Sequence, residues 1–501
     1  MDLVDALRTA VLTLRRDPDG VLPYYLAGSS VTLLGQTVLF VGAAVVFSLL
    51  TAEGRVARFA RLVRGVDLGL GGPGGPNPDP AAVERLGRAM AVLVTPEVLF
   101  VLGVTVVVAL VVVLLARSVA TAAQIHAVYA SFNGRAPLAV GVTGASRDAW
   151  RFVRLSLLAV VLYGVPLLVF GGLAVGASTV APVLGLVVGL GLALLLLPVL
   201  LAVYLTLLFA PQAIVVDDVG AVGAVRRSLG FVRANPVTTV GFVLVNVVLV
   251  VATAGLYWLF ATVSVPQLSS LVTLVVVGPF VGLAKTALYV RLDDVAELPA
   301  RSIRDGLGRG ARRTRRESVD FLREHPGLVG LALALFGVGA VAGWRATSAF
   351  ALPAVRGAPD PSAVFGLVPV DAFLQIAVNN WLVAVAEGYA GLALGVPTAV
   401  NLLFNGVVVG VVANLGFRPA VAVALLAPHG VIEIPALAVA GAVGFDLGRE
   451  AWRWLQGNIE AGDLAHGVER AFYVLLGLVP VFVLAAFVEA FVTPYVGALV
   501  S

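Results

Sequence analysis

The sequence predicts an all-α protein that crosses a membrane many times. Of its 501 residues, 60% are hydrophobic and 12% are charged, and its mean hydropathy is +1.01. Typical soluble proteins carry about 25% charged residues, roughly twice this share. The apolar residues also fall in long uninterrupted runs, as membrane-spanning helices require. We therefore expect a polytopic helical membrane protein with about 11 transmembrane helices and interfacial amphipathic helices between them, and a water-soluble globule is excluded.

Six of the expected spans lie in the first part of the chain. Each is long enough for a bilayer core, which needs about 20 apolar residues of helix. The basic segment RRSLGFVRANP at 226–236 is expected to lie in the interface and to end before Pro236, because the residue before a proline is disfavoured in a helix. The six runs are 22–50, 91–116, 155–178, 182–210, 237–264 and 268–290.

Five further spans follow a densely polar segment at 291–325. Its end, RRESVDFLREHP, shares the Ser, Phe, Arg and Pro spacing of the earlier basic segment, so we expect another helix that stops before a proline. The predicted organisation is a six-span domain at 1–296, a basic linker at 297–316 and a five-span domain at 317–501. The five runs are 327–348, 371–395, 397–416, 420–447 and 469–493.

The distribution of arginine indicates the orientation in the membrane. Cytoplasmic loops are enriched in Lys and Arg, and most arginines here fall in loops that are cytoplasmic if the N-terminus is inside and the C-terminus outside. The arginines of segment 51–90 are the exception. We expect a plasma-membrane protein whose basic residues face anionic lipid or a protein partner, and not nucleic acid. The strongest basic cluster is Arg312, Arg313, Arg315 and Arg316.

The composition excludes several kinds of chemistry. The chain contains no cysteine, so disulfides, thiolate catalysis and thiolate metal sites are excluded. His126 and His466 lie in polar loops and are expected to be solvated. We find no nucleophile paired with a base, no nucleotide-binding loop and no HExxH motif. The sequence therefore predicts no catalytic residues, no cofactor and no enzymatic activity.

Polar residues inside the spans are concentrated in the last third of the chain. Such residues are costly in a bilayer, so their positions are informative. Several pairs are spaced four or seven apart, which places both members on one helical face. Pro428 and Gly430 interrupt an apolar run and predict a broken helix, with His429 near the start of its second piece. The predicted polar core comprises Asn379, Asn380, Glu387, Asn401, Asn405, His429, Gly430, Glu433 and Glu489.

Four interpretations of this polar core are possible. The favoured one is interhelical hydrogen bonding, in which the amide, imidazole and carboxyl groups satisfy one another. A proton or substrate path is the next. A metal site built from His429, Glu433, Glu387 and Glu489 is weaker, because one histidine and three carboxylates form a poor ligand set, and no metal is predicted. A hydrolytic centre has the least support.

Small-residue pairs predict close contacts between helices of the last third. Glycines four residues apart let two helix backbones approach each other. The pairs are Gly339/Gly343, Gly391/Gly395, Gly406/Gly410 and Gly444/Gly448.

The stretch from about 317 to 501 resembles the stage II sporulation protein M family of integral membrane proteins. The residues that carry the resemblance are Asn379-Asn380, NGVVVG at 405–410, PHGVIEIPALAVAGAVG at 428–444 and AAFVEAFVTP at 485–494. The resemblance implies that Asn379, Asn380, Asn405, His429, Gly430, Glu433 and Glu489 match the family's polar signature, without a settled catalytic role. The first six spans are loosely similar to uncharacterised archaeal multi-pass membrane domains.

The resemblance implies a non-enzymatic scaffold or assembly factor in the cell envelope. Its expected partners are the lipid bilayer, other membrane or envelope proteins, and a second copy of the chain. The alternative is a transporter or ion-conducting protein that uses the polar residues around His429 and Glu433.

Overall fold

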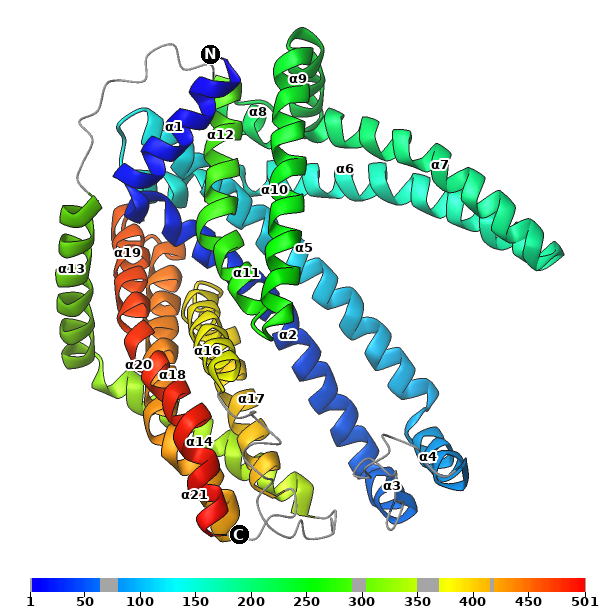
Figure 1. Ribbon diagram of the computed structural model, residues 1–501, viewed down its shortest axis with the longest axis vertical. Helices are drawn as coiled ribbons and strands as arrows, with labels where there is room; N and C mark the ends of the chain where they lie inside the picture. Colours follow the sequence, from blue (N-terminus) through cyan, green and yellow to red (C-terminus); the bar gives the residue numbers. More distant parts are fainter. Residues whose placement is uncertain (1, 64–79, 291–302, 349–368, 415–418, 501) are drawn as a thin grey trace.

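Helices alone make up the described part of the protein, as the sequence predicts. The computed structural model describes residues 2–63, 80–290, 303–348, 369–414 and 419–500, and these ranges contain no β-strand (Figure 1). Ten of the described helical segments are long and apolar enough to cross a membrane. The protein is therefore an all-α, multi-pass membrane protein.

The N-terminal part of the fold contains six such segments, which coincide with the six predicted runs. Short helices connect them. Its elements are α1 (Leu3–Arg16), α2 (Pro18–Ala52), α3 (Arg55–Val63), α4 (Pro80–Leu93), α5 (Pro96–Phe132), α6 (Pro137–Val180), α7 (Pro182–Leu207), α8 (Ala210–Val216), α9 (Ala221–Ala234), α10 (Pro236–Thr262), α11 (Gln267–Val272), the π-helical η1 (Thr273–Val277) and α12 (Gly278–Val290).

The C-terminal part contains the other four segments. Residues 291–302, which carry part of the predicted linker and domain boundary, lie outside the described residues. The elements are α13 (Ile303–Glu324), α14 (Pro326–Ser348), α16 (Val370–Ala390), α17 (Val396–Ala413), α18 (Pro419–Leu455), α19 (Ala461–Gly477), α20 (Val479–Phe487), the π-helical η2 (Val488–Val492) and α21 (Thr493–Leu499).

The one predicted run without a counterpart among the ten apolar segments is 371–395, which corresponds to α16. Its amide and carboxyl side chains lower its hydropathy. However, α16 runs alongside the last span over most of its length. Phe373 packs against Phe487 near one end, and the Tyr389 hydroxyl donates a hydrogen bond to the Val468 carbonyl near the other. The helix therefore extends through the same layer of the bundle despite its polar residues.

Prolines mark several points where one helix ends and the next begins. α9 ends at Ala234 and α10 begins at Pro236, while α13 ends at Glu324 and α14 begins at Pro326. Both predicted stops before proline are confirmed. The physical reason is that proline is tolerated in the first turn of a helix but disfavours a helical conformation in the residue before it.

The helix break predicted at Pro428 and Gly430 is wrong, because α18 continues through both residues. Prolines inside a span are tolerated when neighbouring helices and local adjustments satisfy the freed backbone groups. The chain turns instead at 391–395, between α16 and α17, where Gly395 has a φ of 73°. His429 therefore lies inside a continuous helix and not at a helix N-terminus.

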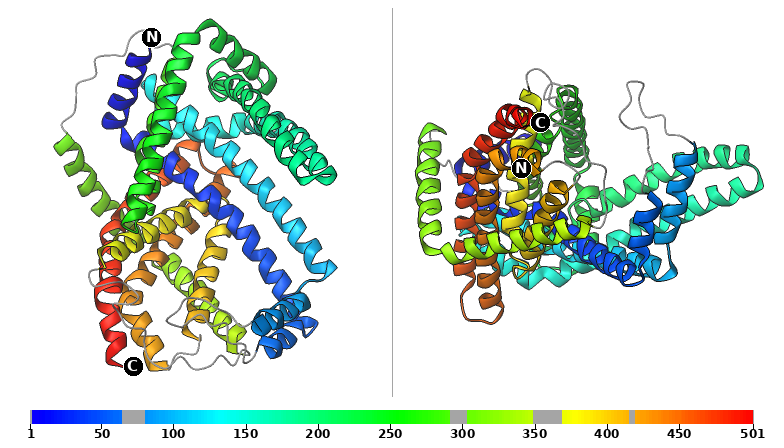
Figure 2. Two further views of the ribbon diagram at one scale, coloured as in Figure 1. Left: turned by 45° about the vertical axis from the view of Figure 1, so that its right-hand side comes forward. Right: turned by 90° about the horizontal axis from the view of Figure 1, so that it is seen from below.

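Helices from the two parts share hydrophobic cores. Leu26 of α2 belongs to one buried cluster with Trp381 of α16 and Phe482 of α20. Phe152 of α6 belongs to another with Ala465 of α19. Figure 2 shows α2, in blue, next to the C-terminal helices in yellow and orange. The two predicted domains are thus packed against each other along α2 and α6.

The predicted glycine pairs lie at contacts between helices. A Cβ at Gly339 of α14 would overlap the backbone of Leu403 on α17, and a Cβ at Gly343 would overlap Val407. Moving four residues along α14, from Gly339 to Gly343, also moves four residues along α17, from Leu403 to Val407, so the two helices run in the same direction. The other pairs also face neighbouring helices: Gly391, Gly395, Gly406, Gly410, Gly444 and Gly448.

α6 and α7 form a hairpin that projects from the rest of the protein (Figures 1 and 2). The sequence contains no charged residue from Leu155 to Val216. Leu168 and Val180 are each 78% exposed. We call the projecting residues 157–201 the α6–α7 arm, and its apolar surface requires lipid or protein around it.

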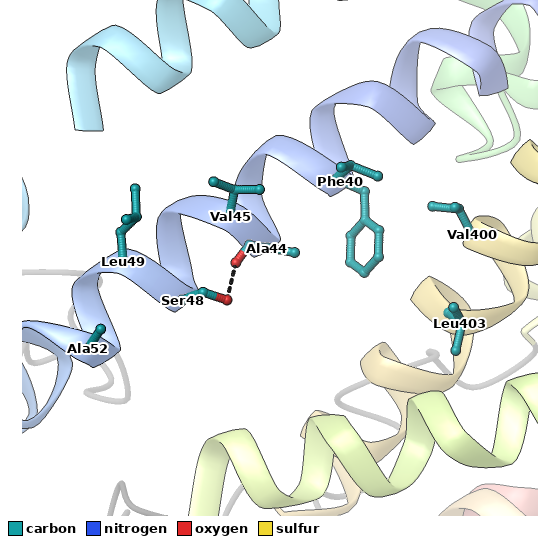
Figure 3. Close-up of a pocket in the computed structure, with 9 residues that line it drawn as sticks. Phe40, Ala44, Val45, Ser48, Leu49, Ala52, Val400 and Leu403 are labelled. Atoms are coloured by element: carbon teal, nitrogen blue, oxygen red, sulfur yellow. Dashed lines mark hydrogen bonds between the residues drawn. The ribbon is translucent and has the colours of Figure 1, made fainter. Parts of the chain in front are cut away.

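A second apolar surface feature is a pocket of about 600 Å³ between α2 and α17 (Figure 3). Phe40 and Leu49 line it from α2, and Val400 and Leu403 line it from α17. Ser48 donates its hydroxyl to the Ala44 carbonyl of its own helix. Among the described lining residues, Ser48 alone carries a hydroxyl group, and that group already has its hydrogen-bond acceptor. The pocket therefore offers an apolar surface suited to a lipid chain.

Candidate functional site

The predicted polar residues form two separate groups in the structure. The first lies where α16 and α17 face α2, and the second lies where α18 faces η2. The first group comprises Asn379, Asn380, Glu387, Asn401 and Asn405, and the second comprises His429, Glu433 and Glu489.

Asn379, Asn401 and Asn405 of the first group line a cavity of about 830 Å³ between the N-terminal and C-terminal parts. Its volume falls within the range of small-molecule sites. Arg117 of α5 is the one charged residue among its described lining residues. Hydroxyl and amide groups provide the other polar side chains: Tyr25, Ser29, Thr32 and Gln36 of α2, Thr121 and Gln124 of α5, Ser269 and Ser270 of α11, Thr273 of η1, Asn379 of α16, and Asn401 and Asn405 of α17.

Glu387 lies behind this cavity and is fully buried. One of its carboxyl oxygens, Oε2, accepts a hydrogen bond from Asn401 Nδ2 at 3.1 Å, and Thr398 donates to its backbone carbonyl at 2.9 Å. Its other oxygen, Oε1, has no hydrogen-bond partner within the described residues. Glu387 therefore joins α16 to α17, which is the interhelical hydrogen bonding that the sequence favoured.

The second group brings three side chains of the predicted metal set together and leaves Glu387 out. One ligand atom from each of His429, Glu433 and Glu489 lies within 4.8 Å of the other two. His429 and Glu433 are one helical turn apart on α18, and Glu489 lies on the π-helical η2. The Nδ1 atom of His429 is 3.3 Å from the hydroxyl of Thr493. This group has the donor atoms to hold a cation.

Two other predicted residues have lesser roles. Asn380 accepts a hydrogen bond from the neighbouring Asn379 at 3.3 Å. Gly430 is buried, but a Cβ there would make only an ordinary contact with Ile434, at 3.6 Å. The packing around α18 therefore does not require glycine at this position.

The predicted polar residues of both groups, and the contact between α14 and α17, lie within one continuous stretch of the sequence. Residues 332–494 match the family model of stage II sporulation protein M. The resemblance predicted from the sequence is thereby confirmed for the C-terminal part. In this sporulation-M-like part, the polar residues predicted from the sequence divide between the cavity region and the His429 group.

Other comparisons concern the remainder of the chain or proteins of unknown activity. Residues 145–292 match a domain of unknown function. An uncharacterised protein of the archaeon Methanocaldococcus jannaschii is 29% identical over 126 residues, which cover 24% of this chain and 71% of that protein. No solved structure matches.

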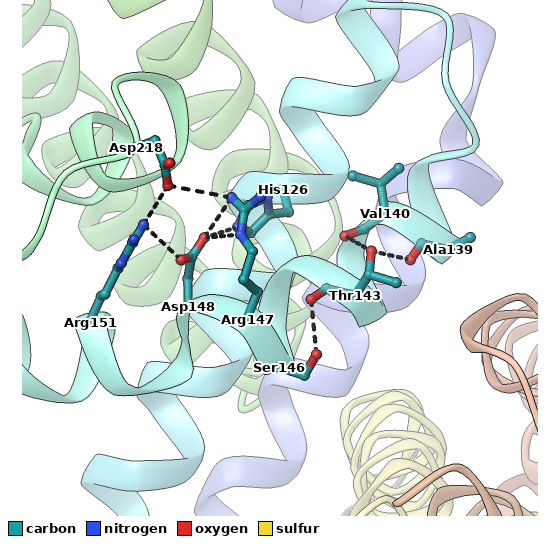
Figure 4. A network of polar contacts seen from close by, with 9 residues as sticks. All are labelled: His126, Ala139, Val140, Thr143, Ser146, Arg147, Asp148, Arg151 and Asp218. Carbon is teal, nitrogen blue, oxygen red and sulfur yellow. Dashed lines mark hydrogen bonds and ion pairs between the residues drawn. The ribbon is translucent and has the colours of Figure 1, made fainter. Parts of the chain in front are cut away.

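Outside the sporulation-M-like part, the structure shows a polar network that the sequence analysis missed (Figure 4). His126 was expected to be solvated but is 5% exposed, and its Nε2 lies 2.9 Å from the fully buried carboxylate of Asp148. Arg147 and Arg151 also bind Asp148, at 3.0 and 3.1 Å, and Arg151 reaches Asp218. The hydrogen bond from Arg151 and its positive charge hold the pKa of Asp218 below the ordinary value. The sequence feature that could have indicated this network is an arginine-rich turn of α6 that also carries an aspartate.

The predicted basic surface of α13 is present, with one correction. Arg312, Arg315 and Arg316 are exposed. Arg313 instead faces the protein: it pairs with Glu469 of α19 at 2.8 Å, and its guanidinium lies over the ring of Tyr473 at 4.4 Å. Arg313 therefore attaches α13 to the bundle and is not a free lipid-facing or partner-facing residue.

We expect Arg313→Gln to destabilise the protein more than Arg312→Gln. Arg313 contacts α19, while Arg312 lies on the exposed face of the same helix. Because the Arg313 side chain is 37% exposed, solvent screens its ion pairs and the expected loss is about 1 kcal/mol. Thermal unfolding of the two variants in detergent measures the difference. Equal midpoints would contradict the assigned role of Arg313.

Proposed function

We propose that this protein moves a small polar solute across the membrane through the cavity between its N-terminal and C-terminal parts. The observation that carries the proposal is the lining of that cavity, in which hydroxyl and amide groups from α2, α5 and α11 face those of α16 and α17. Polar side chains are costly inside a bilayer unless they pair or line an aqueous path. A site at the interface of two membrane domains is also where transporters bind their substrates.

The lining suggests the chemistry of the solute. Amides and hydroxyls both donate and accept hydrogen bonds, and Arg117 adds a positive charge. These groups suit a small polar molecule, neutral or anionic, that carries several hydroxyl, amide or carboxylate groups. In this proposal the protein catalyses no reaction. The orientation proposed from the arginines, with the N-terminus cytoplasmic in the plasma membrane, is compatible with termini at opposite ends of the long axis (Figure 1).

Cysteine accessibility tests the proposal directly, because the natural chain has no cysteine. In proteoliposomes, Asn405→Cys in the cavity is expected to react with a charged, membrane-impermeant thiol reagent added to either side in separate experiments. Val408→Cys on the same helix is the control, since Val408 is outside the cavity lining and 43% exposed on the surface that lipid would cover. We expect it not to react.

Two results would contradict transport. No reaction of Asn405→Cys from either side would mean that the cavity is closed to water. Reaction from one side only would indicate a binding pocket without passage across the membrane. Equal reaction of Val408→Cys would mean that the assay does not distinguish the cavity from the surface, and Thr32→Cys on α2 would then serve as the second cavity position.

A scaffold or assembly factor is the second candidate, as the family resemblance implies. The α6–α7 arm favours it, because the arm presents an uncharged apolar surface away from the bundle. A photo-crosslinking residue at Leu168 or Val180, introduced in the native host, is expected to form adducts with another membrane protein. Adducts with lipid alone would contradict this role.

A further inference from the structure

The second polar group carries a conclusion that does not depend on transport. Glu433 and Glu489 are half-buried and approach each other where α18 faces η2, and neither forms an ion pair within the described residues. No lysine or arginine occurs in the sequence from 419 to 448 or from 471 to 500. Two carboxylates so placed repel each other, and removing a charge from water is costly unless another charge compensates it.

A divalent cation would compensate both charges at once. Two carboxylates and one dication sum to zero, so the complex is neutral within the apolar layer, and the imidazole of His429 supplies a third ligand without adding charge. We propose that His429, Glu433 and Glu489 bind a divalent first-row transition metal ion, and we expect Zn²⁺ to bind there tightly. Mixed nitrogen and oxygen donors suit Zn²⁺ and Mn²⁺, and Zn²⁺ binds such sites more strongly than Mn²⁺.

The geometry is close to that of a three-ligand metal site. Zn²⁺ binds imidazole nitrogen and carboxylate oxygen at about 2.0–2.2 Å, so ligand atoms around it lie roughly 3.4 Å apart. The three atoms here lie within 4.8 Å of one another, and small side-chain rotations close the difference. Three protein ligands also leave one position open for water or another ligand, as in catalytic zinc sites.

A supporting residue completes the arrangement. Metal-binding histidines usually form a hydrogen bond through their second ring nitrogen, which fixes the orientation of the ring. The Nδ1 of His429 has such a partner in the Thr493 hydroxyl, so Nε2 remains for the ion. The π-helical η2 lies directly before Thr493 and contains Glu489, and single π-helical turns occur frequently at functional sites.

The first test is metal binding by the purified full-length protein. After removal of metal with a chelator, titration with Zn²⁺ in detergent is expected to show one ion per chain by calorimetry, with the same stoichiometry in elemental analysis. Glu433→Gln and Glu489→Gln are each expected to weaken binding at least tenfold. His466→Gln is the matched control, because His466 lies on the exposed start of α19, outside the group. Unchanged binding in both glutamate variants, or no binding by the wild type, would overturn the proposal.

The second test starts from the wild-type protein, so its first result does not depend on the folding of any variant. Electron spin-echo spectroscopy of Mn²⁺ bound to the wild type is expected to detect one coupled imidazole nitrogen. The signal should disappear in His429→Gln and persist in His466→Gln. Bound Mn²⁺ without a nitrogen ligand would exclude His429 and overturn the site as proposed. Because none of the three residues lines the cavity, this result is independent of the thiol-labelling result.

Discussion

Replacing Gly406 by alanine is expected to destabilise the protein by about 2–3 kcal/mol or to abolish its folded yield. The added Cβ would overlap the backbone of Phe336 and Ala340 on α14. A flexible side chain could move aside, but a helix backbone can yield only if α14 and α17 separate. That separation would loosen the close contact between the two helices around Gly339, Gly343, Gly406 and Gly410, and it would also disturb Asn405, which precedes Gly406 and lines the cavity.

Gly337→Ala on α14 is the control for this prediction. Gly337 is exposed and has no atom near its Cβ position, so alanine meets open space there. Since alanine favours helix over glycine by up to about 1 kcal/mol, the control is expected to keep or increase stability. Thermal unfolding in detergent, with size-exclusion chromatography for folded yield, measures both variants. A similar loss in both would mean that glycine itself, and not the contact between α14 and α17, is what the helices require.

Replacing Asp148 by asparagine is expected to cost about 1.5–3 kcal/mol, because it removes the charged acceptor that His126, Arg147 and Arg151 share. Asp148 is fully buried, and its carboxylate is the common partner of all three groups. Asparagine preserves the shape of the side chain but leaves the arginines facing one another. We expect the helices that meet here, α5 and α6, to lose their fixed packing at this end.

Asp218→Asn is the matched control, because Asp218 pairs with the same Arg151 but its side chain is 69% exposed. Exposed ion pairs contribute little to stability, so its unfolding midpoint should move far less than that of Asp148→Asn. Denaturation followed by tryptophan fluorescence measures both. If the two variants shift equally, burial of Asp148 is not what makes the network stabilising, and the assignment fails.

The elements of the fold that the sequence predicted are those that depend on local pattern. Apolar runs located the spans, because a bilayer demands a fixed length of apolar helix whatever its neighbours are. Pro236 and Pro326 located helix starts, since proline restricts the backbone of its own and the preceding residue. The glycine pairs indicated where helices come close together, but they did not indicate which helix each pair contacts. The break at Pro428 was wrong because neighbouring helices can satisfy a backbone that the isolated pattern would interrupt.

By itself, the sequence determined the membrane class, the helices and the set of polar residues from which a site could be built. Only the tertiary structure decided which of them meet. It placed Glu387 with Asn401, His429 with Glu489, and His126 with Asp148, and it turned Arg313 inward while its neighbours stayed exposed. The physical reason is that helical periodicity fixes the face on which a residue lies, whereas the rotation and register of helices distant in sequence follow from the packing of the whole bundle.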